Sequence, residues 1–341
     1  MTQLRWRLAD DDGGQGALFE EEVERHVGRG EFRGMEFLHV NARRLINEVP
    51  KASRVPFRWT INAYRGCSHA CVYCFARPTH EYLGMNPGED FERKIVVKVN
   101  AVERVRAELA PGRWAGDHIA MGTNTDPYQR CEGKYRLTQG IVAELSAAAN
   151  PFSILTKSTL ILRDVELLAE AARRTEVRAN FSIGTLDEEV WRTTEPGTPH
   201  PLRRVEAVAR LHEAGVPCGV LIAPVLPGLS DAPDQLEAVV RACVDAGAAS
   251  ITPLLLHLRP GVREHYLGWL AGARPDLLER HARLYPRSYA PAKAQDGLAE
   301  LVRRLAARHG GRTAGPRETR SVEVTPPAPR PPTPSQLRLG L

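Results

Sequence analysis

The sequence predicts an α/β fold built on a partial, TIM-like (β/α)6 barrel, because strand and helix patterns alternate through its middle. Six segments have the apolar or alternating character of strands: residues 58–63, 119–121, 152–155, 177–183, 219–223 and 250–256. Helical patterns lie between or after them, at residues 101–109, 140–149, 165–174, 203–213 and 232–246. Because strands joined by helical crossovers form parallel sheets, the spacing predicts a core barrel over residues 57–260.

Length and composition allow one large hydrophobic core. The chain has 341 residues, of which 43% are hydrophobic, and a barrel domain needs roughly 200–250 residues. The net charge of +5 permits nucleic-acid binding without demanding it. No apolar run is as long as a membrane span, and Asp10–Asp12 interrupts any signal sequence near the start. We therefore expect a cytoplasmic protein with no membrane contact.

The two ends of the chain differ from the core. Residues 1–56 are expected to form an N-terminal extension, with a possible helix at residues 19–24 and a strap over the barrel entrance. Residues 261–310 have helical patterns that would cover the outside of the barrel. Residues 311–341 contain a proline-rich run that favours extended backbone and cannot build a core, which predicts a disordered tail.

A short loop after the first predicted strand carries three closely spaced cysteines. They are Cys67, Cys71 and Cys74. Gly66 gives the backbone room to bend, so that three thiolates can converge on one metal cluster. A cluster held by three thiolates keeps one iron open for chemistry, whereas four thiolates close the site. A zinc site, with His69 or His80 as the fourth ligand, is the alternative.

The spacing Cys67-x-x-x-Cys71-x-x-Cys74, with Tyr73 before the last cysteine, resembles the signature of the radical S-adenosylmethionine (SAM) superfamily. From Tyr64 onward the loop is similar to the spore photoproduct lyase-like branch. The resemblance implies a [4Fe-4S] cluster and SAM as cofactors, and a 5′-deoxyadenosyl radical that abstracts hydrogen from a substrate. It also implies an external electron donor of the flavodoxin or ferredoxin type.

Polar residues follow the apolar strands, at the barrel end where reactive groups gather. The resemblance places the SAM amino group near the backbone after residue 121 and the SAM carboxylate near the ammonium of Lys157. Strand alternation would point Asn180 and Ser182 inward. The candidate cofactor-binding residues are Tyr73, Gly122, Thr123, Asn124, Lys157, Ser158, Asn180 and Ser182. A plain turn before Pro127 and solvated strand ends are the alternatives.

The segment Glu195-Pro-Gly-Thr-Pro, followed by Arg204, is similar to an element of the related sequences. The resemblance implies that Glu195 and Arg204 lie near substrate or SAM as an ion pair, and that Lys157 acts with them as a catalytic group. A glycine-proline turn that caps a helix is the alternative.

The chain departs from its relatives at two places: the Gly-Gly-Glu of many relatives is absent after the second strand, and a cysteine of the related lyases is missing. Those lyases keep a hydrogen-donor cysteine at the end of the second strand, where this chain has Met121. The nearest thiol, Cys131, is expected to be a free surface cysteine, and the alternative is that it moves into the site on a loop. Cys218 and Cys243 are expected to be small buried hydrophobes. The missing cysteine argues against direct thymine-dimer reversal.

The last residues, Gln336–Leu341, resemble the hexapeptide with which bacterial polymerases and repair proteins bind the sliding clamp. Residues 15–19 resemble its shorter version. Leucines on an extended strand can enter a hydrophobic pocket, but they can also dock onto the barrel of the same chain.

Two functions follow from these patterns. The first is a radical SAM enzyme that acts on nucleic acid in repair or modification, with its reaction class open. The alternative is a non-catalytic iron–sulfur redox sensor or a DNA- or clamp-binding protein. Cleavage of SAM after reduction distinguishes the enzyme from the sensor.

Overall fold

The computed structural model describes residues 23–50, 53 and 55–314. Its main sheet has the strand order β11-β10-β9-β8-β7-β4-β3. The strands are β3 (Ile46–Glu48), β4 (Trp59–Ile61), β7 (Ile119–Met121), β8 (Phe152–Thr156), β9 (Val177–Ser182), β10 (Cys218–Val225) and β11 (Ser250–Leu255). The pairings from β4 through β11 are all parallel, and β3 adds to β4 in the antiparallel sense. The predicted α/β fold with six parallel strands is confirmed.

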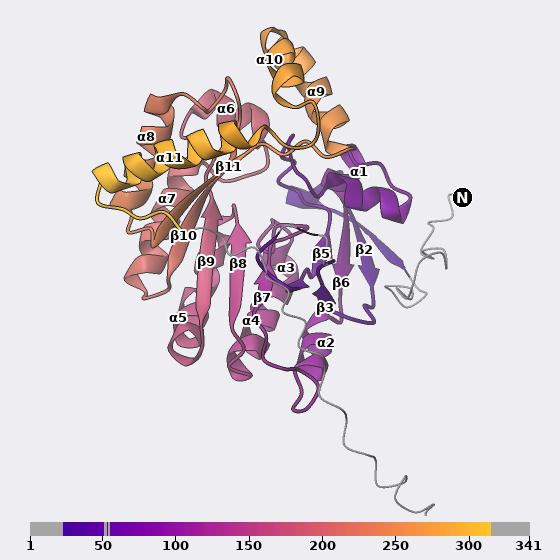
Figure 1. The fold of residues 1–341 in the computed structure, drawn as a ribbon. Helices are drawn as coiled ribbons and strands as arrows, with labels where there is room; N and C mark the ends of the chain where they lie inside the picture. Colours follow the sequence, from indigo (N-terminus) through magenta and orange to yellow (C-terminus); the bar gives the residue numbers. More distant parts are fainter. Residues whose placement is uncertain (1–22, 51–52, 54, 315–341) are drawn as a thin grey trace, which may run out of the picture.

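Helices connect these strands and lie along the outer side of the sheet (Figure 1). The long ones are α2 (Ala101–Glu108), α4 (Leu137–Ala147), α5 (Val165–Arg174), α7 (Pro201–Glu213) and α8 (Pro233–Asp245), and the short ones are α3 (Glu132–Tyr135) and α6 (Glu188–Thr194). Strand alternation sets which residues meet them: in β9, Val177, Ala179 and Phe181 are buried in the main core. The residues between them, Arg178 and Asn180, point to the opposite face of the sheet and border a second cavity.

A second sheet has the strand order β1-β2-β6-β5, which the sequence analysis did not predict. Its strands are β1 (Glu24–Val27), β2 (Glu36–Val40), β5 (Tyr64–Arg65) and β6 (Lys94–Lys98), and α1 (Glu89–Arg93) precedes β6. The segment expected to be a strap contains β2 instead, and the side chains of Phe37, Leu38 and Val40 in this strand are buried. The helix expected at residues 19–24 falls largely outside the described residues, and Glu24 itself begins β1. Because β5 leads directly into the cysteine loop, this sheet helps to position that loop.

The C-terminal part is helical, as predicted. It contains α9 (Val262–Ala273), α10 (Leu278–Leu284) and α11 (Ala292–Arg308), with α11 packed against α8 and β11 (Figure 1). Tyr266 and Leu270 of α9 form a second core cluster with Cys71, Val72 and Tyr73 of the cysteine loop. This cover therefore shields the loop as well as the sheet. The prediction of a disordered tail from residue 311 was wrong for its first residues, because the carbonyl of Arg312 accepts from the N–H of Ile251 in β11 at 2.9 Å. The rest of the expected tail lies outside the described residues, and the proposed domain boundaries stay a prediction.

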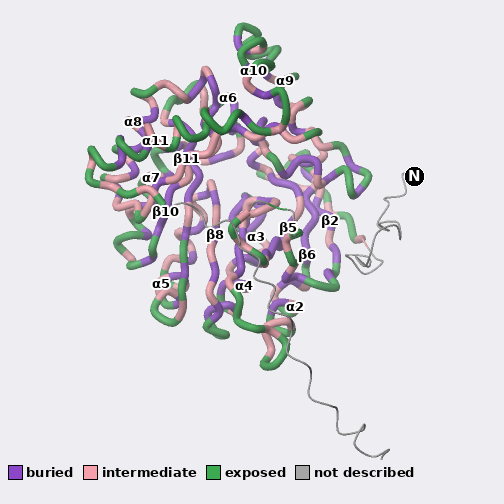
Figure 2. The backbone as a smooth tube through the Cα atoms, viewed as in Figure 1, coloured by how far each residue is buried: buried purple, intermediate pink, exposed green. Residues whose placement is uncertain are grey.

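Burial follows this layered arrangement. Figure 2 shows buried backbone along the strands of both sheets and exposed backbone on the outward sides of the helices. No helix within residues 23–50, 53 and 55–314 is long and apolar enough to cross a membrane.

Candidate functional site

Three cysteine thiols border one cavity of about 240 Å³ at the carboxyl ends of the strands, two from buried residues and the third, Cys74, from a half-buried one. They belong to Cys67, Cys71 and Cys74, and all three are free cysteines. Burial is the main cause that raises the pKa of each thiol above its ordinary value. A buried thiolate therefore needs a positive partner, and a metal cluster provides one. The donor set fits a cluster held by three cysteines.

Polar contacts from beyond β7 fix the first turn of the cysteine loop. The amide of Gln129 donates to the carbonyl of Gly66 at 3.0 Å and accepts from the backbone N–H of Ser68 at 3.0 Å. The hydroxyl of Thr125 donates to the same carbonyl at 2.6 Å. Gly66 has φ +81°, and a Cβ there would lie 2.9 Å from the carbonyl oxygen of Phe91. The turn therefore requires glycine.

Arg77 holds the other side of the loop. Its guanidinium is fully buried and donates to the carbonyls of Cys71 at 3.0 Å and Ala70 at 3.2 Å. It forms an ion pair with Glu92 at 2.5 Å and lies over the ring of Phe91. A buried cation is stable only with such partners. The sequence analysis missed this residue, although an arginine three positions after the last cysteine was the available signal.

Lys157 reaches the cavity from the end of β8. Its ammonium donates to the hydroxyl of Ser182 at 2.6 Å and to the carbonyl of Ala223 at 3.4 Å. The same nitrogen lies 3.0 Å from the carboxylate of Glu195. These contacts place a single positive charge at the cavity wall, where it can meet an anionic group of a ligand.

Glu195 lies behind this wall, between two cations. Arg204 pairs with it at 2.5 Å, and the hydroxyls of Tyr73 and Thr198 donate to it. Burial alone would raise the pKa of Glu195, but Arg204 and Lys157 outweigh burial and hold the pKa well below its usual range. Glu195 is therefore ionised at neutral pH, and it positions both Lys157 and Tyr73.

The exit of β7 is shaped by a glycine and an asparagine. Gly122 has φ +88°, and a Cβ there would lie 2.0 Å from the carbonyl oxygen of Leu155. The side chain of Asn62 donates to Thr123 at 3.0 Å and accepts from the backbone N–H of Asn124 at 3.1 Å. Asn62, which the sequence analysis missed, therefore fixes the turn that presents these groups to the cavity.

Most predicted residues line the cavity together. They are Cys67, Cys71, Cys74, Tyr73, Gly122, Thr123, Asn124, Lys157 and Ser182. Four predicted residues, all within the described part of the chain, are not among the lining residues: Ser158, Asn180, Glu195 and Arg204. Ser158 caps a short 3-10 helix by accepting from the N–H of Leu160 at 3.2 Å. Asn180, two residues before Ser182 in β9, borders a separate cavity.

The sequence analysis also missed a buried ion pair at the cavity. Nδ1 of His69 lies 3.3 Å from the carboxylate of Asp126. Asp126 accepts further hydrogen bonds from Thr156 and from the backbone N–H of Lys157, each at 2.7 Å. This pair ties the cysteine loop to the ends of β7 and β8. His80, the other histidine of the zinc alternative, instead contacts the carbonyl of Lys94 at 3.0 Å.

Cys131 is buried in the main core, so the prediction of a surface thiol was wrong. It precedes α3, and burial raises the pKa of its thiol. Cys218 and Cys243 are buried, as predicted. Of the cysteines that the structure describes, Cys67, Cys71 and Cys74 are the ones that line the cavity.

Comparisons with known proteins found a family model, related sequences and similar folds. Residues 61–242 match the family model of the radical SAM superfamily. An uncharacterized protein of Mycobacterium tuberculosis is 43% identical over 318 residues, which cover 92% of this chain and 94% of the relative.

Two solved structures of spore photoproduct lyase have a similar fold. One, of a variant of the lyase, has a TM-score of 0.59 at 19% identity and covers 81% of each chain. The other, complexed with dinucleoside spore photoproduct, has a TM-score of 0.57 at 17% identity and covers 80% of this chain and 79% of the lyase.

Proposed function

This chain belongs to the radical SAM superfamily and is an enzyme of that type, and we propose that it acts on nucleic acid in repair or modification, using a [4Fe-4S] cluster and SAM. One observation carries the proposal: three free thiols and the ammonium of Lys157 border the same cavity. This combination suits a cluster with one open iron beside an anionic cofactor group.

The cofactors would supply a carbon radical that removes a hydrogen atom from the substrate. Cys67, Cys71 and Cys74 would hold the cluster. Lys157 would pair with the carboxylate of SAM, because its ammonium faces the cavity from a network that already orients it. The apolar wall formed by Leu254–Leu256 would help to exclude water from the site.

Two observations support nucleic acid as the substrate class. A lyase of similar fold has been solved with a dinucleoside photoproduct. The cavity opens beside Phe75, whose exposed fraction is 46%, and such an aromatic ring can stack on a base. We do not propose photoproduct reversal through a cysteine hydrogen donor, because Cys131 is packed in the core.

Anaerobically reconstituted protein, reduced with dithionite and supplied with SAM, tests this function. We expect roughly four irons per chain and 5′-deoxyadenosine that is absent in Cys71→Ala. Single-stranded DNA, ultraviolet-irradiated duplex DNA and tRNA are then added separately. The nucleic acid that is the substrate should accelerate SAM cleavage, and its own mass should change. A cluster that never cleaves SAM would favour the redox-sensor alternative, and cleavage that no nucleic acid affects would reject the substrate class.

Radical SAM enzymes need an electron donor, and we propose a flavodoxin or ferredoxin in the cytoplasm. Replacing dithionite by reduced flavodoxin or ferredoxin should sustain 5′-deoxyadenosine formation. Failure of both proteins to reduce the cluster would reject this partner class.

We also propose that the C-terminal residues Gln336–Leu341, which lie outside the described part, bind a sliding clamp. The proposal is supported by alternating leucines at the end of a proline-rich segment. The fluorescence anisotropy of a labelled peptide of the last twelve residues should rise when clamp is added. The anisotropy of a peptide with Leu337 and Leu339 changed to alanine should stay the same. Equal behaviour of both peptides would reject it.

A further inference from the structure

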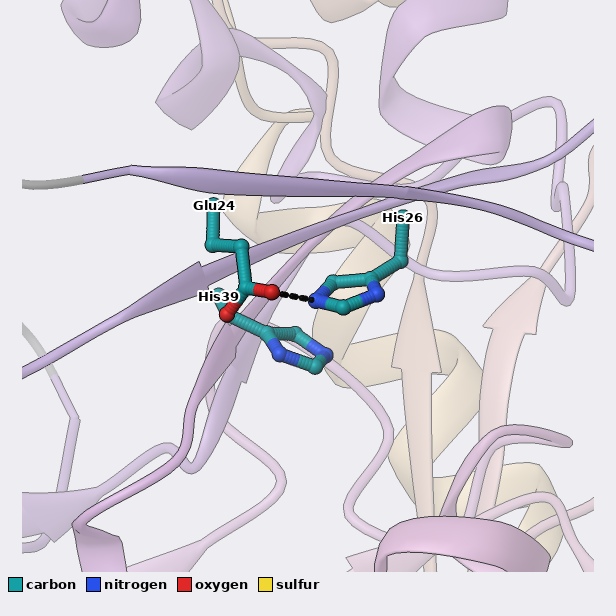
Figure 3. Close-up of side chains that lie close together, drawn as sticks. All are labelled: Glu24, His26 and His39. Atoms are coloured by element: carbon teal, nitrogen blue, oxygen red, sulfur yellow. Dashed lines mark ion pairs between the residues drawn. The ribbon is translucent and has the colours of Figure 1, made fainter.

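We propose that Glu24, His26 and His39 form a binding site for one divalent transition-metal ion, with zinc as the preferred ion, on the second sheet (Figure 3). In the antiparallel pair of β1 and β2, Glu24 lies directly opposite His39. His26 is two positions along β1 and therefore projects from the same face as Glu24. The strand register thus brings one carboxylate and two imidazoles together.

The distances suit a single ion. One ligand atom from each side chain lies within 4.8 Å of the other two. Oε1 of Glu24 is 3.0 Å from Nε2 of His26, and the two imidazole rings are 4.0 Å apart between centroids. Zinc bonds of about 2.0–2.2 Å in a tetrahedron separate neighbouring ligand atoms by about 3.3 Å. Only a small adjustment of these side chains is therefore needed.

A polar atom of the cluster lacks a partner. Nε2 of His26 is buried and has no hydrogen-bond partner within residues 23–50, 53 and 55–314, although Glu24 is close to it. Glu24 therefore approaches this nitrogen without an aligned hydrogen bond. A metal ion would take the lone pair of this nitrogen and balance the carboxylate.

Tyr135 of α3 supplies the outer contact that metal-binding histidines commonly make. Its hydroxyl lies 2.8 Å from Nε2 of His39 and fixes the ring, which leaves Nδ1 as the ligand atom. The ring of Tyr135 packs in turn against Phe37, with centroids 5.7 Å apart. The orientation of His39 is therefore set by the fold.

The ligand chemistry selects the ion. Two imidazole nitrogens and one carboxylate suit zinc, whereas calcium and magnesium prefer oxygen ligands throughout. Three protein ligands leave the fourth position for water, and the side chain of Glu24 is exposed enough (72%) to allow this. Binding would join the edge strand β1 to β2 and so stabilise the second sheet.

The site can be tested on full-length, cluster-loaded protein, in which the three cavity cysteines are already occupied and the other three are buried. Zinc is titrated in competition with a chromophoric chelator, and cobalt(II) is added in a parallel experiment. We expect one equivalent of tightly bound zinc, and a cobalt spectrum without the thiolate charge-transfer absorption that a cysteine site would give. His26→Ala and Glu24→Gln should abolish this binding, and Tyr135→Phe should weaken it by about 10-fold or more.

His309→Ala is the matched control, because Nε2 of His309, directly after α11, lies 3.0 Å from Glu237 of α8 in a histidine–glutamate contact of the same kind. This variant should keep the zinc equivalent. Glu24→Gln keeps the test valid if a histidine variant fails to fold, since Glu24 is exposed. Unchanged zinc affinity in Glu24→Gln and His26→Ala, or no stoichiometric zinc in the wild type, would overturn the proposal.

Discussion

Nζ of Lys157 lies 3.0 Å from Oε1 of Glu195, and Arg204 holds the other oxygen of the same carboxylate at 2.5 Å. The side chain of Glu195 is 4% exposed and that of Lys157 is 14% exposed. One buried anion therefore sits between a cation at the cavity wall and a cation in the interior. The arrangement keeps Lys157 directed at the cavity before any ligand arrives.

Replacing Glu195 by glutamine should destabilise the protein by about 3–5 kcal/mol, because the buried Arg204 loses its charge partner. The free energy of unfolding in urea measures this effect. Glu188→Gln is the control: Glu188 pairs with Arg192 on the exposed side of α6, and its loss should change the free energy by less than about 0.5 kcal/mol. Equal effects of the two variants would contradict the buried network.

A second prediction concerns Lys98 and pH. Burial lowers the pKa of Lys98 to about 7, and its ammonium donates to the carbonyl of Asn62 at 2.8 Å. Between pH 7 and the unfolded-state value of about 10.4, the unfolded chain binds more protons at this group. Stability should therefore rise with pH in this window, by up to ~1.4 kcal/mol per pH unit.

Lys98→Met removes this group and should flatten the rise in the free energy of unfolding between pH 7 and 10. Lys293→Met is the control, because Lys293 is exposed near the start of α11. A pH profile that is the same in wild type and Lys98→Met would show that the buried amine does not titrate in this range.

The sequence predicted the six parallel strands of the main sheet because they are short apolar or alternating runs separated by helical patterns, but it missed the antiparallel edge strand β3, which lies in the segment expected to be a strap. It missed the second sheet for a physical reason. Tyr64–Arg65 is two residues long and Lys94–Lys98 directly follows a short helix, so neither has a boundary that local patterns reveal. Their pairing depends on contacts between distant segments.

In the site, too, residues marked by local sequence patterns were predicted, and residues that act through contacts between distant segments were missed. The cysteines and Lys157 were found because a motif and strand ends mark them. Gln129 and Arg77 were missed, since their role is to bond backbone carbonyls of the cysteine loop. Only Arg77 left a signal in the sequence, its position three residues after Cys74.

Ser158 and Asn180 look like cavity residues by their positions in the sequence. However, Ser158 caps the short helix that follows β8, and Asn180 lies two residues before Ser182 in β9 and borders another cavity.

Gln129→Leu should reduce cluster content without unfolding the protein. The change removes the hydrogen bonds to Gly66 and Ser68 while keeping the volume of a buried side chain, so the cysteine loop loses its fixed turn. Iron and sulfide per chain after anaerobic reconstitution, together with the electron paramagnetic resonance signal of the reduced cluster, measure this. Gln295→Leu, which removes a comparable bond to the carbonyl of Ala290 at the start of α11, should keep full iron content. A full cluster in Gln129→Leu would show that the cysteines alone fix the loop.

Lys157→Gln should weaken SAM binding while leaving the cluster in place. A hydrogen bond to a charged group contributes about 1.5–3 kcal/mol, so its loss corresponds to a roughly 10- to 150-fold larger dissociation constant. Folding should survive, because Glu195 keeps its pair with Arg204 at 2.5 Å. Equilibrium dialysis of labelled SAM against cluster-loaded protein measures the affinity, with iron content determined on the same samples and Lys293→Gln as the control. If SAM binds Lys157→Gln as tightly as the wild type at equal iron content, the ammonium does not contact the cofactor, and its network with Glu195 and Ser182 serves only to support the cavity wall.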